Sequence, residues 1–221
     1  MSREVGIPFG DSELAGLVDA AEGPVAAFVL AHGAGGDMRH PFLAGIAEAL
    51  AASGVSTLRF NFPYKTAGRG YPDRPPVLMG AWRAALSDVR ERTGLPVAAG
   101  GKSLGGRMAS MVAAEDGEAF SGRALVFFGY PLHAPGRPQK LRDEHLSRVA
   151  VPMLFVEGTA DPLARSDLVR EVVGRLGSKA RLHMVEGGDH SFRVRGAKRP
   201  DREIGLELGQ VAAEFAREAV G

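Results

Sequence analysis

The sequence predicts an α/β fold in which helices cover both faces of a mostly parallel sheet. Short apolar runs of strand length alternate along the chain with segments whose apolar residues recur at helical spacing. Such alternation is typical of strand–helix–strand units, whose strands run parallel. The 221 residues contain no internal repeat, low-complexity tail or long linker, so we expect a single domain over residues 1–221.

The first half of the chain is expected to open with a hairpin and to continue with strand–helix units. Segments 3–9 and 12–19 alternate polar and apolar residues around a Gly-Asp turn, which suits an antiparallel pair. The near-continuous apolar run 24–31 predicts a buried strand. The expected elements that follow are a helix at 41–53, a strand at 55–60, a polar Gly/Pro-rich loop at 61–76 and a helix at 77–93.

The second half repeats this alternation and ends in an amphipathic helix. An apolar strand at 96–101 turns directly into a helix at 103–114. After it we expect strands at 123–128, 151–157 and 179–186, helices at 164–176 and 201–219, and a loop at 130–150 with one short helical piece.

The direct turn from strand to helix holds the most informative motif. Gly101-Lys102-Ser103-Leu104-Gly105 reads G-x-S-x-G. In a strand–turn–helix this spacing holds one serine hydroxyl at a sharp corner above the sheet. The flanking glycines are needed because a Cβ there would collide with the neighbouring strand or helix. Ser103 is therefore the predicted nucleophile, and a plain helix N-cap is its structural alternative.

The same residues also match the G-K-[ST] end of a phosphate-binding loop. That motif needs a glycine five positions before Gly101, where this chain has Pro96. The residues between them form a strand-like run with no room for a phosphate cradle. A nucleotide-binding function is therefore disfavoured.

Three further loops at predicted strand ends carry polar residues, and ligands of open α/β sheets lie outside these carboxyl ends. A serine hydroxyl needs a base such as neutral imidazole, and the imidazole needs a carboxylate to fix its tautomer. The chain order Ser103, Asp161, His190 therefore predicts nucleophile, orienting acid and general base. Asp161 could instead only start a turn, and Asp189 could be the acid, although adjacent side chains in a loop usually diverge.

Composition disfavours several other classes of function. The chain is 45% hydrophobic and 24% charged, with a formal net charge of +1 and scattered Lys and Arg, so neither nucleic acid nor membrane is an expected partner. It has no cysteine and no His/Asp/Glu cluster with metal-ligand spacing, so no metal or cofactor is expected. Without a signal-like or membrane-spanning run, we expect a cytoplasmic monomer or small homo-oligomer.

On these motifs the chain resembles the α/β-hydrolases, close to the dienelactone-hydrolase-like enzymes and to the KANSL- and testis-expressed-type hydrolase-like proteins. The resemblance implies an α/β-hydrolase fold and a serine hydrolase that cleaves an ester, thioester or related acyl bond through an acyl-enzyme. It also implies an oxyanion hole from the backbone N–H groups of Ala34 and Leu104, with His32 bracing the oxyanion loop. Dienelactone hydrolases use a cysteine nucleophile, which this chain lacks. The matching segments are 32–36, 60–64, 101–106, 129–132, 158–162 and 188–192.

The substrate site is expected to be open, with a small-molecule acyl substrate. Only residues 130–150 separate the strands where many α/β-hydrolases insert a cap, so the loop 61–76 is expected to border the site. The alternative function is a hydrolase-fold protein that binds a ligand or acts as a scaffold, with little turnover. Polar loop residues expected to contact the substrate are Tyr64, Lys65, Arg69 and His133.

Overall fold

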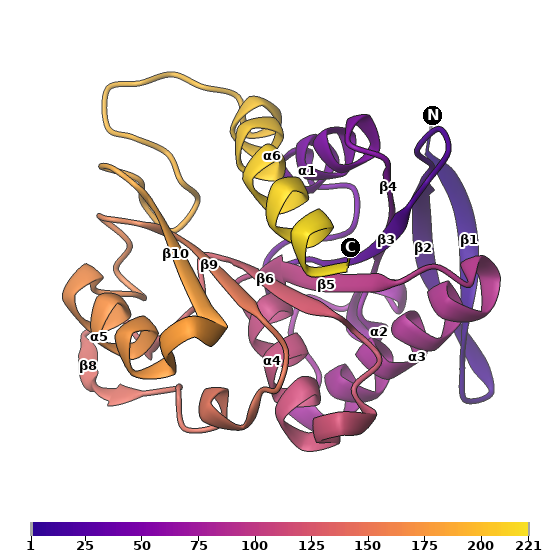
Figure 1. Cartoon of the computed structure of the whole chain (residues 1–221), viewed down its shortest axis with the longest axis horizontal. Coiled ribbons are helices and arrows are strands. Elements are labelled where there is room, and N and C mark those ends of the chain that lie inside the picture. The colour runs from indigo at the N-terminus through magenta and orange to yellow at the C-terminus, as the bar shows by residue number, and fades with distance from the viewer. Residues whose placement is uncertain (1, 221) are drawn as a thin grey trace.

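An eight-stranded sheet forms the centre of the computed structural model, which describes residues 2–220 (Figure 1). Its strand order is β1-β2-β4-β3-β5-β6-β9-β10. The antiparallel pairs are β1 with β2 and β2 with β4, and every other pair is parallel. The mostly parallel sheet confirms the predicted fold class. The strands are β1 (Arg3–Phe9), β2 (Ser12–Asp19), β3 (Ala26–Ala31), β4 (Val55–Phe60), β5 (Val97–Lys102), β6 (Ala124–Phe128), β9 (Met153–Gly158) and β10 (Ala180–Val185).

Helices cover the sheet on both faces, as Figure 1 shows. Successive side chains of a strand point to opposite faces, so Val29 belongs to one hydrophobic core and Leu30 to the other. α1 and α6 pack over the second core, and α3, α4 and α5 pack over the first. The helices are α1 (Pro41–Ala52), α2 (Pro63–Thr66), α3 (Pro75–Thr93), α4 (Leu104–Asp116), α5 (Ser166–Leu176) and α6 (Asp201–Val220).

The predicted strands and helices agree with the structure to within about two residues at most ends, and the differences lie in the loops. The loop 61–76 contains the short helix α2, and α3 begins at Pro75 because proline suits the first helical turn. Between β6 and β9 the described chain has only a small hairpin and one 3₁₀ turn, so no cap domain covers the sheet there. The additional elements are β7 (His133–Ala134), β8 (Arg137–Leu141), η1 (Gly117–Ala119), η2 (Leu146–Arg148) and η3 (Gly177–Lys179).

Among residues 2–220, no helix combines the length and the apolar character that a membrane span requires.

Two glycines let α1 and α6 touch backbone to backbone. A Cβ added at Gly45 would lie 2.1 Å from the carbonyl oxygen of Arg202, and one at Gly205 would lie 2.0 Å from that of Phe42. Real Cβ atoms do not approach this closely, so any larger residue must push the two helices apart. The contact fixes where α1 and α6 begin, and both beginnings lie beside the cavity described below.

We expect Gly205→Ala to lower the free energy of unfolding by about 2 kcal/mol or more, because the new methyl group overlaps backbone of α1. Gly174 offers a matched control in α5, since a Cβ there meets nothing within 4 Å. Gly174→Ala should raise stability by about 0.5–1 kcal/mol through helix propensity alone. Urea denaturation of both variants measures the difference, and equal stabilities would contradict the close helix contact.

Candidate active site

Ser103 stands at the turn between β5 and α4 in a strained backbone conformation. Its φ is 50° and its ψ is −111°, a region that residues other than glycine rarely adopt. The Ser103 N–H donates to the carbonyl of Phe128 and the Arg107 N–H donates to the carbonyl of Ser103, both at 3.0 Å. The Ser103 side chain makes no helix-capping hydrogen bond. The N-cap alternative therefore does not describe it.

The glycines around Ser103 are required by close backbone contacts. A Cβ at Gly105 would lie 2.7 Å from the carbonyl oxygens of both Ala31 and His32, and one at Gly101 would lie 2.7 Å from the nitrogen of Gly106. This confirms the steric reason predicted for glycines on both sides of the serine. The turn can exist only because these side chains are absent.

His190 connects Ser103 to a buried carboxylate. Its Nε2 lies 2.9 Å from the Ser103 Oγ, and its Nδ1 lies 2.6 Å from Oδ2 of Asp161. Because a carboxylate accepts hydrogen bonds, the proton belongs on Nδ1, and Nε2 is then free to accept from the serine hydroxyl. Asp161 also starts a turn, since its Oδ1 accepts from the Leu163 N–H at 2.7 Å. The two roles weighed for Asp161 are thus compatible.

Asp189 is committed to the turn that carries His190. Its Oδ1 accepts from the N–H groups of Ser191 at 2.7 Å and Arg193 at 3.0 Å. Phe192 in the same turn has a φ of 63° and stacks on Phe42 with ring centroids 5.5 Å apart. The alternative that Asp189 orients His190 therefore does not fit the geometry.

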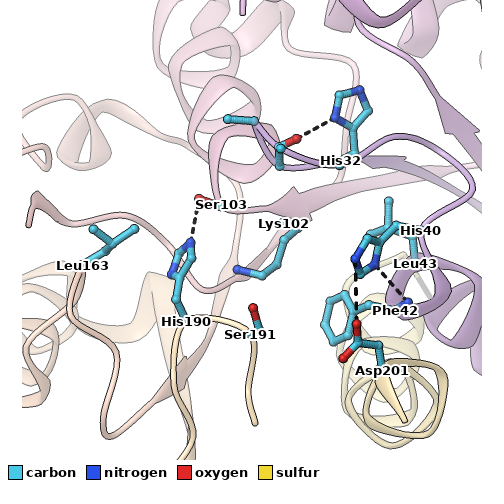
Figure 2. A pocket seen from close by; sticks show the side chains of 14 residues that line it. His32, His40, Phe42, Leu43, Lys102, Ser103, Leu163, His190, Ser191 and Asp201 are labelled. Carbon is cyan, nitrogen blue, oxygen red and sulfur yellow. Dashed lines mark hydrogen bonds and ion pairs between the residues drawn. The ribbon is translucent and has the colours of Figure 1, made fainter. Parts of the chain in front are cut away.

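A cavity of about 350 Å³ opens beside Ser103 and His190 (Figure 2). The turn 33–36 forms one wall, and a Cβ at Gly33 would lie only 3.6 Å from the Cβ of Ser103. The beginnings of α1 and α6 also line the cavity. Further lining side chains are His40, Phe42, Leu43, Leu163, Ser191 and Asp201.

His32 braces the turn that precedes α1, as expected. Its Nδ1–H donates to the carbonyl of Gly33 at 2.7 Å, and its Nε2 accepts from the Phe62 N–H at 3.2 Å. Burial lowers the pKa of His32 to about 4, so the ring is neutral and keeps this single tautomer at pH 7.

The structure places the two predicted oxyanion donors at the same end of the sheet as Ser103. Ala34 lines the cavity, and Leu104 is the first residue of α4, where the helical N–H groups lack intrahelical acceptors. Within residues 2–220 neither N–H donates to another protein group. Their role in holding an oxyanion stays a prediction.

The four residues expected to contact the substrate do not line this cavity, which corrects the sequence-based expectation. Tyr64 is fully buried and its hydroxyl donates to the carbonyl of Ala34 at 2.9 Å, so it supports the turn 33–36. Lys65 lies with its Nζ 5.9 Å from the Tyr64 ring centroid, and Arg69 pairs with Asp73 at 2.7 Å.

His133 points inward as well. It is buried, its Nδ1–H donates to the carbonyl of Ala134 at 3.0 Å, and its Nε2 accepts from the Arg165 N–H at 3.1 Å. The Nε2 contact thus fixes the loop before α5, and the Nδ1 contact orients the ring. The loop 61–76 contributes no residue to the cavity wall, so it does not border the site as expected.

Lys102 lines the cavity and was not singled out from the sequence as a site residue. Its Nζ is buried without a hydrogen-bond partner among the described residues, and it lies 5.5 Å from the centroid of the Phe192 ring. In Figure 2 the side chain points toward His190. Burial lowers the pKa of Lys102 to about 8, although nearby carboxyl groups such as Asp161 raise it. The sequence feature that could have indicated Lys102 as a site residue is its position at the end of an otherwise apolar, buried strand.

Glu157 of β9 is a second buried ionisable group near Lys102. It accepts from the Tyr130 N–H at 2.6 Å through Oε1, whereas Oε2 has no partner within residues 2–220. Burial raises the pKa of Glu157 well above its usual range, and the charge of Asp161 raises it further. Burial therefore favours the protonated form of this side chain. Within the same residues, no three His, Asp or Glu side chains lie close enough together to hold a metal ion.

We expect Lys102→Met to remove a pH dependence of stability. In the folded chain the pKa of Lys102 is about 8, against 10.5 in the unfolded chain, so the unfolded state binds more protons between these values. Stability of the native protein therefore rises with pH across this window. Urea denaturation from pH 8 to pH 10.5 should show a smaller rise for Lys102→Met, with exposed Lys179→Met as control. Identical slopes in all three proteins would contradict the burial of the ammonium group.

A family profile described as an alpha/beta hydrolase domain matches residues 24–219. The chain belongs to the α/β-hydrolase family. The matched region contains Ser103, Asp161 and His190, together with every helix and all strands except the opening hairpin.

Solved structures of other α/β-hydrolases share the fold. A dienelactone hydrolase from Anabaena variabilis is 22% identical, with 100% of this chain and 99% of that chain covered and a TM-score of 0.78. The esterase domain of a Rhodothermus marinus protein is 18% identical, with 100% of each chain covered and a TM-score of 0.77. An α/β serine hydrolase without a lid from Xanthomonas campestris is 20% identical, with coverages of 98% and 94% and a TM-score of 0.74. At these identities the likeness shows the fold alone.

Proposed function

We propose that this α/β-hydrolase is a serine hydrolase that cleaves a carboxylic ester, thioester or related acyl bond through an acyl-enzyme. The proposal rests on two consecutive hydrogen bonds beside an open cavity. His190 Nε2 lies 2.9 Å from the Ser103 Oγ, and His190 Nδ1 lies 2.6 Å from an Asp161 carboxylate oxygen. Solved structures of the same fold include an esterase domain and a dienelactone hydrolase, which supports an acyl substrate.

The proposed reaction begins when the Ser103 Oγ attacks the acyl carbon and its proton moves to His190 Nε2. Asp161 stabilises the resulting imidazolium through the Nδ1–H hydrogen bond. The carbonyl oxygen becomes an oxyanion between the N–H groups of Ala34 and Leu104, each of which can contribute about 3 kcal/mol to the transition state. The imidazolium then protonates the leaving group as the scissile bond breaks. Water repeats the cycle on the acyl-enzyme and releases the acid.

The cavity sets the size and polarity of the proposed acyl group. Phe42, Leu43 and Leu163 give it apolar walls, and its volume of about 350 Å³ suits a small substrate. No cap formed by residues 2–220 covers it, so a longer leaving group can extend into solvent.

We expect Asp161→Asn to lower kcat/KM on p-nitrophenyl acetate by about 10³-fold or more, because an amide favours the wrong tautomer of His190. Asp189→Asn is the matched control. Its side-chain oxygen still accepts in the turn, so its activity should stay within about threefold of native. The comparison uses initial rates of folded protein, and a larger loss in Asp189→Asn than in Asp161→Asn would contradict the assignment.

The alternative proposal is a hydrolase-fold binding or scaffold protein with little turnover. The geometry favours the enzyme, since the hydrogen bonds of His190 are formed in the orientation that catalysis requires. Absence of hydrolysis across a broad panel of esters and thioesters, together with tight binding of a ligand or partner, would favour the alternative.

A further inference from the structure

A second cavity, of about 470 Å³, lies between α4 and the β7–β8 hairpin and is lined by basic side chains. It shares no lining residue with the cavity beside Ser103. In Figure 1, β8 lies below α5 and on the side of the sheet that carries α4. We call it the basic cavity because four of its lining residues are cationic, against the single carboxylate of Glu144: Arg107, Arg137, Lys140 and Arg142.

The cations of the basic cavity form no ion pair within residues 2–220, although the Glu144 carboxylate also lines the cavity. None of the four takes part in an ion pair there, whereas arginines such as Arg83 and Arg193 do. The Arg107 Nε is buried without any hydrogen-bond partner in that part of the chain. The nearest acidic neighbour in sequence, Asp143, is already paired with Arg175.

The guanidinium groups of Arg107 and Arg142, which both line this cavity, repel each other electrostatically. Burial lowers the pKa of Arg107, and the positive charge of Arg142 lowers it further. His145 adds no charge, because burial and the neighbouring arginines lower its pKa to about 4 while its Nε2 lies 2.8 Å from the Ser110 Oγ. Like charges held together without a partner are costly, and a bound anion would relieve that cost.

We propose that the basic cavity binds the phosphate group of a small phosphorylated molecule. Guanidinium groups match phosphate oxygens in pairs, and three guanidiniums with one ammonium can neutralise a di- or trianion. The volume falls in the range of small-ligand pockets. The net charge of the chain is only +1, and these four cations line one concave site. This favours a small ligand over nucleic acid.

Titration calorimetry with inorganic pyrophosphate tests the proposal on the native protein. We expect saturable binding to one site, and a loss of about tenfold or more in affinity in Arg142→Gln, because charge-assisted hydrogen bonds to phosphate are stronger than neutral ones. Arg137→Gln/Lys140→Gln is the second variant, since both side chains are exposed and their replacement does not touch the core. It should weaken binding by a similar factor.

Arg170→Gln is the matched control, because Arg170 is an exposed arginine of α5 outside the basic cavity. Its affinity for pyrophosphate should equal that of the native protein. Three outcomes would overturn the proposal: no saturable binding of pyrophosphate, unchanged affinity in the folded Arg137→Gln/Lys140→Gln variant, or citrate binding as tightly as pyrophosphate. Tighter binding of single-stranded DNA than of pyrophosphate would also overturn it in favour of a nucleic-acid surface. The test is independent of hydrolase activity.

Discussion

The positive φ of Ser103 is the constraint on which the rest of the structure depends. A serine holds φ of 50° only where the surrounding structure enforces it, and here Gly101 and Gly105 bring β5, α4 and the end of β3 into contact. The G-x-S-x-G motif therefore belongs in the middle of a parallel sheet. There the Phe128 carbonyl accepts from the Ser103 N–H, and Gly33 lies close beside the Ser103 side chain.

The parallel order of the strands then brings distant residues to one edge. Asp161 follows β9 and His190 follows β10, and the turn after β3 stands beside Ser103. Helices α1 and α6 complete the cavity because Gly45 and Gly205 let them meet at backbone distance. The basic cavity, which Arg107 of α4 lines, shares no residue with the cavity beside Ser103.

The fold and the central site were predictable because each depends on local patterns. Alternating strand and helix periods gave the sheet, and the G-x-S-x-G spacing with the order of Ser103, Asp161 and His190 gave the residues now seen in contact. Loop side chains were not predictable in the same way. Tyr64 and His133 lie between the predicted strands and helices, yet both side chains are buried. The direction of such a side chain depends on tertiary packing, which the spacing of apolar residues along the sequence does not encode. Arg107 and Arg142 are far apart in the sequence, and only the tertiary fold brings them to the same cavity.

The central claim is that the strained turn presents an activated serine, and labelling with a fluorophosphonate probe tests it most directly. The account predicts one covalent adduct, located on Ser103 by mass spectrometry, and its near-complete loss in His190→Ala. A well-folded protein that is not labelled, or that is labelled equally without His190, would contradict the account.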